Sequence, residues 1–130
     1  APAFLFFEPA VARLAPRRSW LADLAEGSPR RFFSILAGGL VCGLFWESLN
    51  YWAGAKWHYT VPWPAGPKLF EMPLLGYLGF PPFALGCVSA WEAHRLWWDE
   101  APEPARAVWA FTLAVLSLLA FSAIDAGTVR

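Results

Sequence analysis

Three stretches of the chain are apolar over lengths that would cross a membrane. Residues 32–52 carry one charge, that of Glu47, and residues 72–91 and 107–124 carry none. A helix of about 20 residues, rising about 1.5 Å per residue, matches the hydrocarbon core of a bilayer. The pattern predicts an all-α integral membrane helical bundle with about three transmembrane helices, at residues 32–52, 74–98 and 105–124.

The middle stretch is interrupted by Pro81-Pro82. Proline breaks a helix in its interior but is tolerated in its first turn. Two arrangements fit: a kinked helix from Leu74 to Trp91, or a helix that starts near Pro81 and runs to about Trp98. In the second arrangement, which we favour, residues 72–80 form a short re-entrant piece that must be buried in protein or line a cavity.

The N-terminal segment, residues 1–30, has a different pattern. Residues 4–7 are apolar, but the polar residues and prolines that follow end this run before it could cross a bilayer. It is either the end of an upstream span or an interfacial helix. Residues 19–27 predict a further short helix at the surface, with Ser19 as its N-cap.

The basic residues set the expected orientation. Seven basic residues lie on one side of the predicted spans: Arg13, Arg17, Arg18, Arg30, Arg31, Arg95 and Arg106. Three lie on the other side: Lys56, Lys68 and Arg130. The positive-inside rule places the Arg-rich side in the cytoplasm. The loop at residues 53–73 then faces outward.

Composition supports a single membrane domain over residues 1–130. The chain is 58% hydrophobic and 18% aromatic with nine Trp, and its 15% charged residues fall below the roughly 25% of soluble domains. The zero net charge argues against nucleic-acid binding.

Cys42 and Cys87 lie in apolar stretches and are expected to be buried, inert thiols. No nucleotide-binding or hydrolase motif occurs.

Polar residues at the outer edge of the first span are the candidate site. Glu47 and Asn50 share a helical face, and His58 and Glu71 lie in the outer loop. Ionisable groups at membrane depth are costly unless used or paired. Glu47 is either a proton carrier, general base or ligand anchor, or a structural acid bonded to Asn50, Tyr59 or the loop. We favour the structural interpretation.

No metal site is predicted, because the spacing of Glu47, His58 and Glu71 matches no ligand pattern. His58 alone is more typical of a hydrogen-bonded interfacial residue. Gly39 and Gly43 have small-xxx-small spacing, which favours close helix packing. Their partner is either another helix of this chain, the interpretation that we favour, or another subunit.

His94 lies four residues after Ala90 and shortly before Trp97-Trp98. This spacing resembles the pigment-ligating helices of bacterial light-harvesting polypeptides, although the flanking Glu92 and Arg95 suit the headgroup region better. No cofactor is predicted. A bound lipid or pigment, carotenoid or bacteriochlorophyll, is compatible with the apolar chain.

The segment from Ser19 to about Phe83 resembles a family of uncharacterised polytopic bacterial membrane proteins. The motifs that carry the resemblance are Trp46-Glu47, Asn50-Tyr51-Trp52, Lys56-Trp57, Tyr59-Thr60, Pro62, and the block Phe70 to Leu85. It implies a multi-pass protein of the bacterial cytoplasmic membrane, with additional helices upstream in other members, and supplies no activity. Relatives tend to carry an acid where this chain has Gly86, which favours a structural role.

Two functions follow as hypotheses. The favoured one is a non-catalytic integral membrane subunit that packs within a larger bacterial photosynthetic or respiratory complex, with membrane lipids and other transmembrane subunits as partners. The alternative is a membrane enzyme or carrier for a lipid or isoprenoid, with Glu47 and Glu71 as acid and base.

Overall fold

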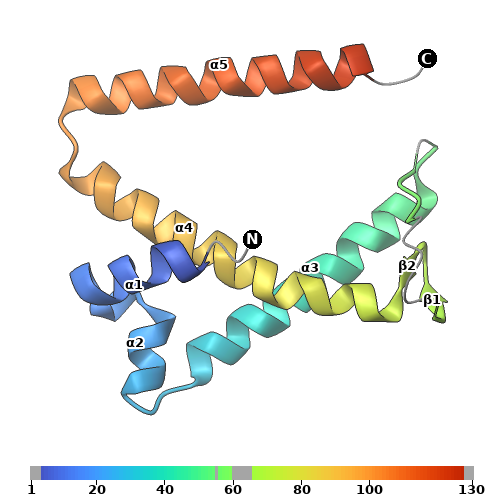
Figure 1. Ribbon diagram of the computed structural model, residues 1–130, viewed down its shortest axis with the longest axis horizontal. Helices are drawn as coiled ribbons and strands as arrows, with labels where there is room; N and C mark the ends of the chain where they lie inside the picture. Colours follow the sequence, from blue (N-terminus) through green and yellow to red (C-terminus); the bar gives the residue numbers. More distant parts are fainter. Residues whose placement is uncertain (1–3, 55, 60–65, 128–130) are drawn as a thin grey trace. The chain divides into compact units, whose positions relative to one another are not determined.

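The computed structural model describes residues 4–54, 56–59 and 66–127, and it is 81% helical (Figure 1). Three helices are long and apolar enough to cross a membrane: Arg30–Trp52, Leu74–Glu100 and Glu103–Gly127. A short N-terminal helix precedes them. The predicted all-α fold with about three membrane-spanning helices is therefore confirmed. The chain forms two compact units, Ala1–Arg95 and Leu96–Arg130.

The first long helix, α3 (Arg30–Trp52), presents one narrow stripe to the rest of its unit. Its buried residues are Gly39, Gly43 and Glu47, spaced four apart. Residues at this spacing lie above one another on one helix face. Most other α3 side chains are apolar and exposed, as expected of a helix that meets lipid.

The last part of the loop at residues 53–73 forms a small hairpin. Strands β1 (Lys68–Leu69) and β2 (Met72–Pro73) pair antiparallel, with Leu69 opposite Met72. A 3-10 helix, η2 (Leu74–Gly79), then leads into α4 (Phe80–Glu100). The α-helix thus starts at Phe80, with both prolines in its first turn, where their missing N–H groups need no partner. This start matches the second of the two arrangements that the sequence allowed.

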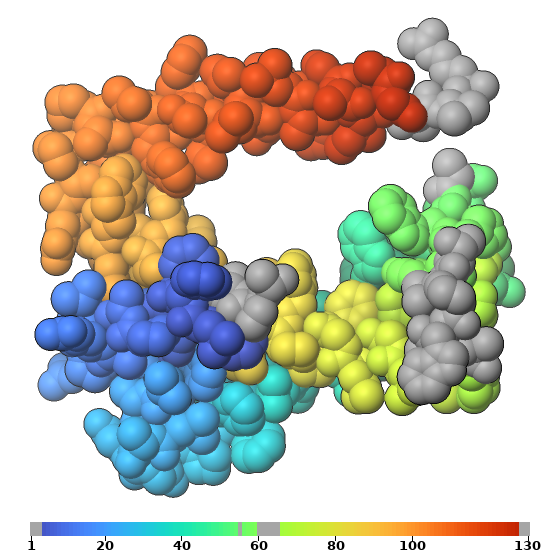
Figure 2. Space-filling model, viewed as in Figure 1, coloured from blue at the N-terminus to red at the C-terminus, as the bar shows by residue number. Residues whose placement is uncertain are grey.

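The N-terminal segment forms α1 (Phe4–Leu14), the single-turn η1 (Pro16–Arg18) and α2 (Trp20–Ala25). Helix α1 continues through Pro9 and is too short to span a bilayer. The predicted N-cap is confirmed, because the Ser19 hydroxyl accepts a hydrogen bond from the Ala22 N–H at 3.0 Å. In Figure 2 the blue N-terminal segment lies against the yellow part of α4.

The second unit contains the end of α4 and the helix α5 (Glu103–Gly127). The Arg106 side chain stabilises the turn between the two helices. It donates a hydrogen bond to the Ala101 carbonyl at 2.8 Å and lies over the Trp98 ring. The Trp97 and Trp109 rings pack at 5.7 Å. Within this unit by itself, no residue of α5 is buried.

Candidate functional site

Asn50, in the last turn of α3, anchors the start of the loop at residues 53–73, which we call the outer loop after its predicted orientation. Its amide oxygen accepts from the Trp57 N–H at 2.7 Å, and its amide nitrogen donates to the Trp57 carbonyl at 3.0 Å. A single side chain therefore satisfies both backbone groups of one loop residue, much as a β-strand neighbour would. Asn50 is the partner of the loop and not, as the sequence allowed, of Glu47.

Glu47, one turn earlier, is fully buried. The Tyr59 hydroxyl donates to its Oε1 at 2.6 Å, which ties the loop to α3 a second time. Burial, reinforced by this hydrogen bond and the nearby Glu47 charge, raises the pKa of Tyr59, so its hydroxyl keeps its proton. One of the structural contacts expected for Glu47, that with Tyr59, is thus present.

The other oxygen of Glu47 is left without a partner. Among the described residues, two buried side-chain oxygens make no hydrogen bond: Oε2 of Glu47 and Oε2 of Glu92. Glu92 has a charged neighbour, because Arg95 Nη1 lies 3.4 Å from its Oε1. Within the described residues, Glu47 forms one hydrogen bond, from the neutral phenol of Tyr59, and no ion pair, so its carboxyl is the less satisfied of the two.

Glu71 belongs to a separate cluster in the loop between α3 and α4. Its carboxylate contacts Lys56 Nζ at 2.6 Å and His58 Nδ1 at 3.4 Å. The hydrogen bond from Lys56 holds the pKa of Glu71 below its ordinary value. The structure therefore brings His58 and Glu71 together as a pair. No group of three potential metal ligands occurs within the described residues.

The backbone just before Glu71 is strained. Phe70 has φ of 57°, a conformation that costs a residue with a side chain about 1 kcal/mol or more. It occupies the two-residue turn between β1 and β2 together with Glu71. The centroid of its ring lies 5.7 Å from that of Tyr51. The next residue, Glu71, is held by its ion pair with Lys56. These contacts fix the turn against the end of α3.

Gly39 and Gly43 pack against α4 of the same chain. A Cβ on Gly39 would lie 2.7 Å from the Ala84 Cβ and 2.8 Å from the Phe80 carbonyl oxygen. A Cβ on Gly43 would overlap the Phe80 ring. The glycines therefore permit an internal helix contact, which agrees with the interpretation favoured from the sequence. By contrast, a Cβ on the adjacent Gly38 would meet nothing within 4 Å.

Beside this contact, α3 and α4 enclose an apolar groove of about 660 Å³. Its lining is Ile35, Gly38, Gly39, Cys42, Trp46, Phe80, Phe83, Ala84, Cys87 and Val88. We call it the α3–α4 groove. The prediction that both cysteines are buried is wrong, because both are exposed and line this groove as free thiols. An apolar stretch signals burial in soluble proteins, whereas a membrane helix turns such residues toward lipid.

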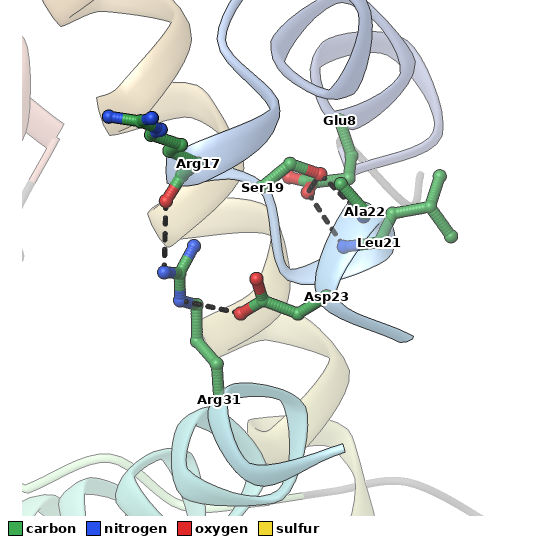
Figure 3. A network of polar contacts seen from close by, with 7 residues as sticks. All are labelled: Glu8, Arg17, Ser19, Leu21, Ala22, Asp23 and Arg31. Carbon is green, nitrogen blue, oxygen red and sulfur yellow. Dashed lines mark hydrogen bonds and ion pairs between the residues drawn. The ribbon is translucent and has the colours of Figure 1, made fainter. Parts of the chain in front are cut away.

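A third polar cluster, which the sequence did not reveal, centres on Glu8 of α1. Both Glu8 oxygens are engaged: Oε1 accepts from the Ser19 hydroxyl at 2.7 Å and the Leu21 N–H at 3.2 Å (Figure 3), and Oε2 accepts from the Ser89 hydroxyl at 2.6 Å. The Trp20 indole N–H donates to Ser89 at 3.0 Å. Glu8, Ser19 and Ser89 are buried to 2% exposure or less.

The Glu8 network connects the N-terminal helices to the centre of α4. Ser89 lies nine residues after Phe80 in a helix of 21 residues. Trp20 also packs against Phe4 of α1 and Phe32 of α3, with ring centroids 6.1 and 5.4 Å apart. An isolated acid in an apolar helix was the available signal, but the sequence could not indicate which distant hydroxyl it meets.

A further contact fixes the beginning of α3 to the same N-terminal segment. The Arg31 guanidinium forms an ion pair with Asp23 at 3.0 Å and donates to the Arg17 carbonyl at 3.0 Å (Figure 3). On α4, the ring of His94 lies 6.1 Å from that of Trp91. Pigment ligation by His94 stays a prediction.

Comparison with known proteins gives no match: no family model, no curated protein and no solved structure corresponds to this chain. The family resemblance seen in the sequence therefore stays an expectation. Asn50, Tyr59, Lys56 and Glu8 hold segments of the chain together, whereas one oxygen each of Glu47 and Glu92 has no hydrogen-bond partner among the described residues.

Proposed function

We propose that the protein is a non-catalytic subunit of a larger membrane complex in the bacterial cytoplasmic membrane, photosynthetic or respiratory in kind. The supporting observation is the use of its polar side chains. Asn50 and Tyr59 hold the loop, Lys56 holds Glu71, and Glu8 binds the N-terminal helices to α4. These contacts stabilise one arrangement of segments and present no catalytic array.

The apolar surface supports the same proposal. Helix α5 has large apolar residues around its whole circumference, among them Val108, Phe111, Leu116, Leu119 and Ile124. A helix that is apolar all round belongs in lipid or among other helices. In the proposed complex, this surface packs against neighbouring transmembrane subunits, and the Arg-rich N-terminal segment faces the cytoplasm.

Extraction of the tagged full chain from its own membranes in mild detergent tests this role. A native gel should show a band well above the mass of the free chain, with partner subunits in fixed stoichiometry and, for a photosynthetic complex, pigment absorbance. A chain that migrates alone, with no stoichiometric partner at any detergent concentration that keeps it folded, contradicts the proposal.

The second candidate is a membrane enzyme or carrier for a lipid or isoprenoid that uses Glu47 and Glu71. The observation in its favour is the unpartnered oxygen of Glu47. Against it, Glu71 is already paired with Lys56 and His58. Glu47→Gln distinguishes the two: an altered membrane lipid profile with assembly intact supports the enzyme, and an unchanged profile supports the subunit.

A further inference from the structure

Three arginines of the N-terminal segment and the start of α3 have guanidinium groups without a partner in the described structure. Arg13, Arg17 and Arg30 are exposed, and their side chains form no hydrogen bond or ion pair with a described residue. Arg31 behaves differently, because its guanidinium pairs with Asp23 and donates to the Arg17 carbonyl (Figure 3). The fold therefore uses Arg31 and leaves the other three groups available. We call these three residues the arginine surface.

The acids of the same segment do not neutralise the arginine surface. Residues 4–31 contain the acids Glu8, Asp23 and Glu26. Glu8 is buried and already accepts three hydrogen bonds, and Asp23 is paired with Arg31. Glu26 is exposed and forms no ion pair with the arginine surface. Three unpaired guanidinium groups therefore stand against one unpaired carboxylate, so this part of the protein attracts anions.

The contacts of Arg31 hold the arginine surface at the end of a membrane-spanning helix. Helix α3 begins at Arg30 and is long and apolar enough to cross a membrane. Because Arg31 donates to the Arg17 carbonyl at 3.0 Å, η1 is held beside the first turn of α3. The polar headgroup layer lies immediately outside the hydrocarbon core that such a helix crosses. Arg17 and Arg30 therefore lie at the depth of the lipid phosphates.

Helix α1 places exposed apolar side chains next to these charges. Phe6 and Leu14 are 76% and 73% exposed, respectively. Leu14 directly follows Arg13, and Phe6 lies seven residues before Arg13, on the same helix face. Large apolar side chains are more stable among acyl chains than in water. A short helix that combines exposed apolar residues with arginine is typical of segments that lie in the headgroup region and bind anionic lipids.

We propose that the arginine surface binds the phosphate groups of anionic phospholipids, whose acyl chains contact the exposed side chains of α1. A guanidinium group fits a phosphate because it is planar and donates two parallel hydrogen bonds. In this arrangement α1 is an interfacial helix, one of the two interpretations that the sequence allowed. The proposal requires no partner chain, so it is independent of the proposed role as a subunit.

The net charge of the headgroup determines which lipid is preferred. Phosphatidylglycerol has one negative charge, whereas phosphatidylcholine carries the same phosphate together with a positive choline. Each arginine or lysine near a lipid surface strengthens the binding of anionic lipid by roughly fivefold. We therefore expect phosphatidylglycerol to bind at least about tenfold more tightly than phosphatidylcholine with the same acyl chains.

Native mass spectrometry of the full chain in detergent, titrated with one lipid at a time, measures both dissociation constants. The triple variant Arg13→Gln, Arg17→Gln and Arg30→Gln removes no side-chain contact of the described structure. It should bind phosphatidylglycerol as weakly as phosphatidylcholine, with no change for phosphatidylcholine. Arg17→Gln alone should weaken the binding of phosphatidylglycerol by roughly fivefold, and it decides the test if the triple variant fails to fold.

Lys68→Gln is the matched control. Lys68 is an exposed basic residue of β1, and the hairpin that contains it packs through Phe70 on Tyr51 at the other end of α3. This variant should leave the preference for phosphatidylglycerol unchanged. Glycerol phosphate, a headgroup without acyl chains, should not displace the lipid at an equal concentration. Equal affinity of the parent for the two lipids, an unchanged preference in Arg17→Gln, an equal loss in Lys68→Gln, or displacement by glycerol phosphate overturns the proposal.

Discussion

Removal of the Glu8 carboxyl should detach the N-terminal helices from α4. Glu8→Leu keeps the apolar character of α1 but leaves the two serine hydroxyls and the Leu21 N–H without an acceptor. Each buried polar group that loses its partner costs about 1–3 kcal/mol. Since the hydroxyls of Ser19 and Ser89 can turn toward nearby carbonyls, we expect a total loss of about 3 kcal/mol in the free energy of unfolding.

Glu8→Gln should cost less, about 1 kcal/mol. The Gln oxygen can still accept from Ser19 and Leu21, and its amide can donate to the Ser89 oxygen. That oxygen already accepts from the Trp20 indole, so only the Ser89 hydroxyl proton loses its acceptor. The two variants therefore separate the loss of hydrogen bonds from the loss of negative charge.

Unfolding by titration with a denaturing detergent, followed by circular dichroism, measures the stability of each variant. Trypsin adds a local measurement, because detachment of α1 and α2 exposes the bonds after Arg13 and Arg17 to cleavage. Glu26→Gln is the control for Glu8→Gln, because it makes the same change of a carboxyl to an amide at an exposed position. A Glu8→Leu protein that unfolds within 0.5 kcal/mol of the parent (about the scatter of surface substitutions) with unchanged cleavage would refute the reasoning.

Three other changes test the remaining contacts. Gly39→Ala should destabilise the protein by about 1–3 kcal/mol through overpacking against α4, whereas Gly38→Ala should be neutral or stabilising; equal detergent-unfolding curves contradict this contrast. Asn50→Ala should cost about 1–3 kcal/mol and speed amide exchange in the outer loop, with no change in the N-terminal helices. Because Lys56 lowers the pKa of Glu71 below its ordinary 4.5, the ion pair stabilises the fold above that pH and is lost as the pH falls through the lowered value. The melting temperature of the parent should therefore drop more steeply than that of Glu71→Gln between pH 5 and pH 3, and parallel curves would show that the pair contributes nothing.

The three membrane-spanning helices were predictable because lipid imposes a simple rule on sequence. A segment of about 20 residues with almost no charge has few alternatives to a helix in a membrane. The start of α4 was the favoured one of two arrangements for a similar local reason, since a first turn accommodates both prolines without the loss of a helical hydrogen bond. The N-cap at Ser19 and the candidate polar residues of the outer loop also followed from residue type and spacing.

Which polar groups meet was decided only by the tertiary structure. Glu8 and Ser89 are 81 residues apart, and neither the acid nor the serine carries a signal of its partner. The exposure of the cysteines depends on which face of α3 turns toward α4. Gly39 and Gly43 fix that face through their contacts with Phe80 and Ala84, and the local sequence does not show which residues of α4 they meet. Membrane insertion depends on the composition of each segment alone, so the sequence determines it. The pairing of buried polar atoms depends on the positions of several segments at once, and these exist only after the helices have packed.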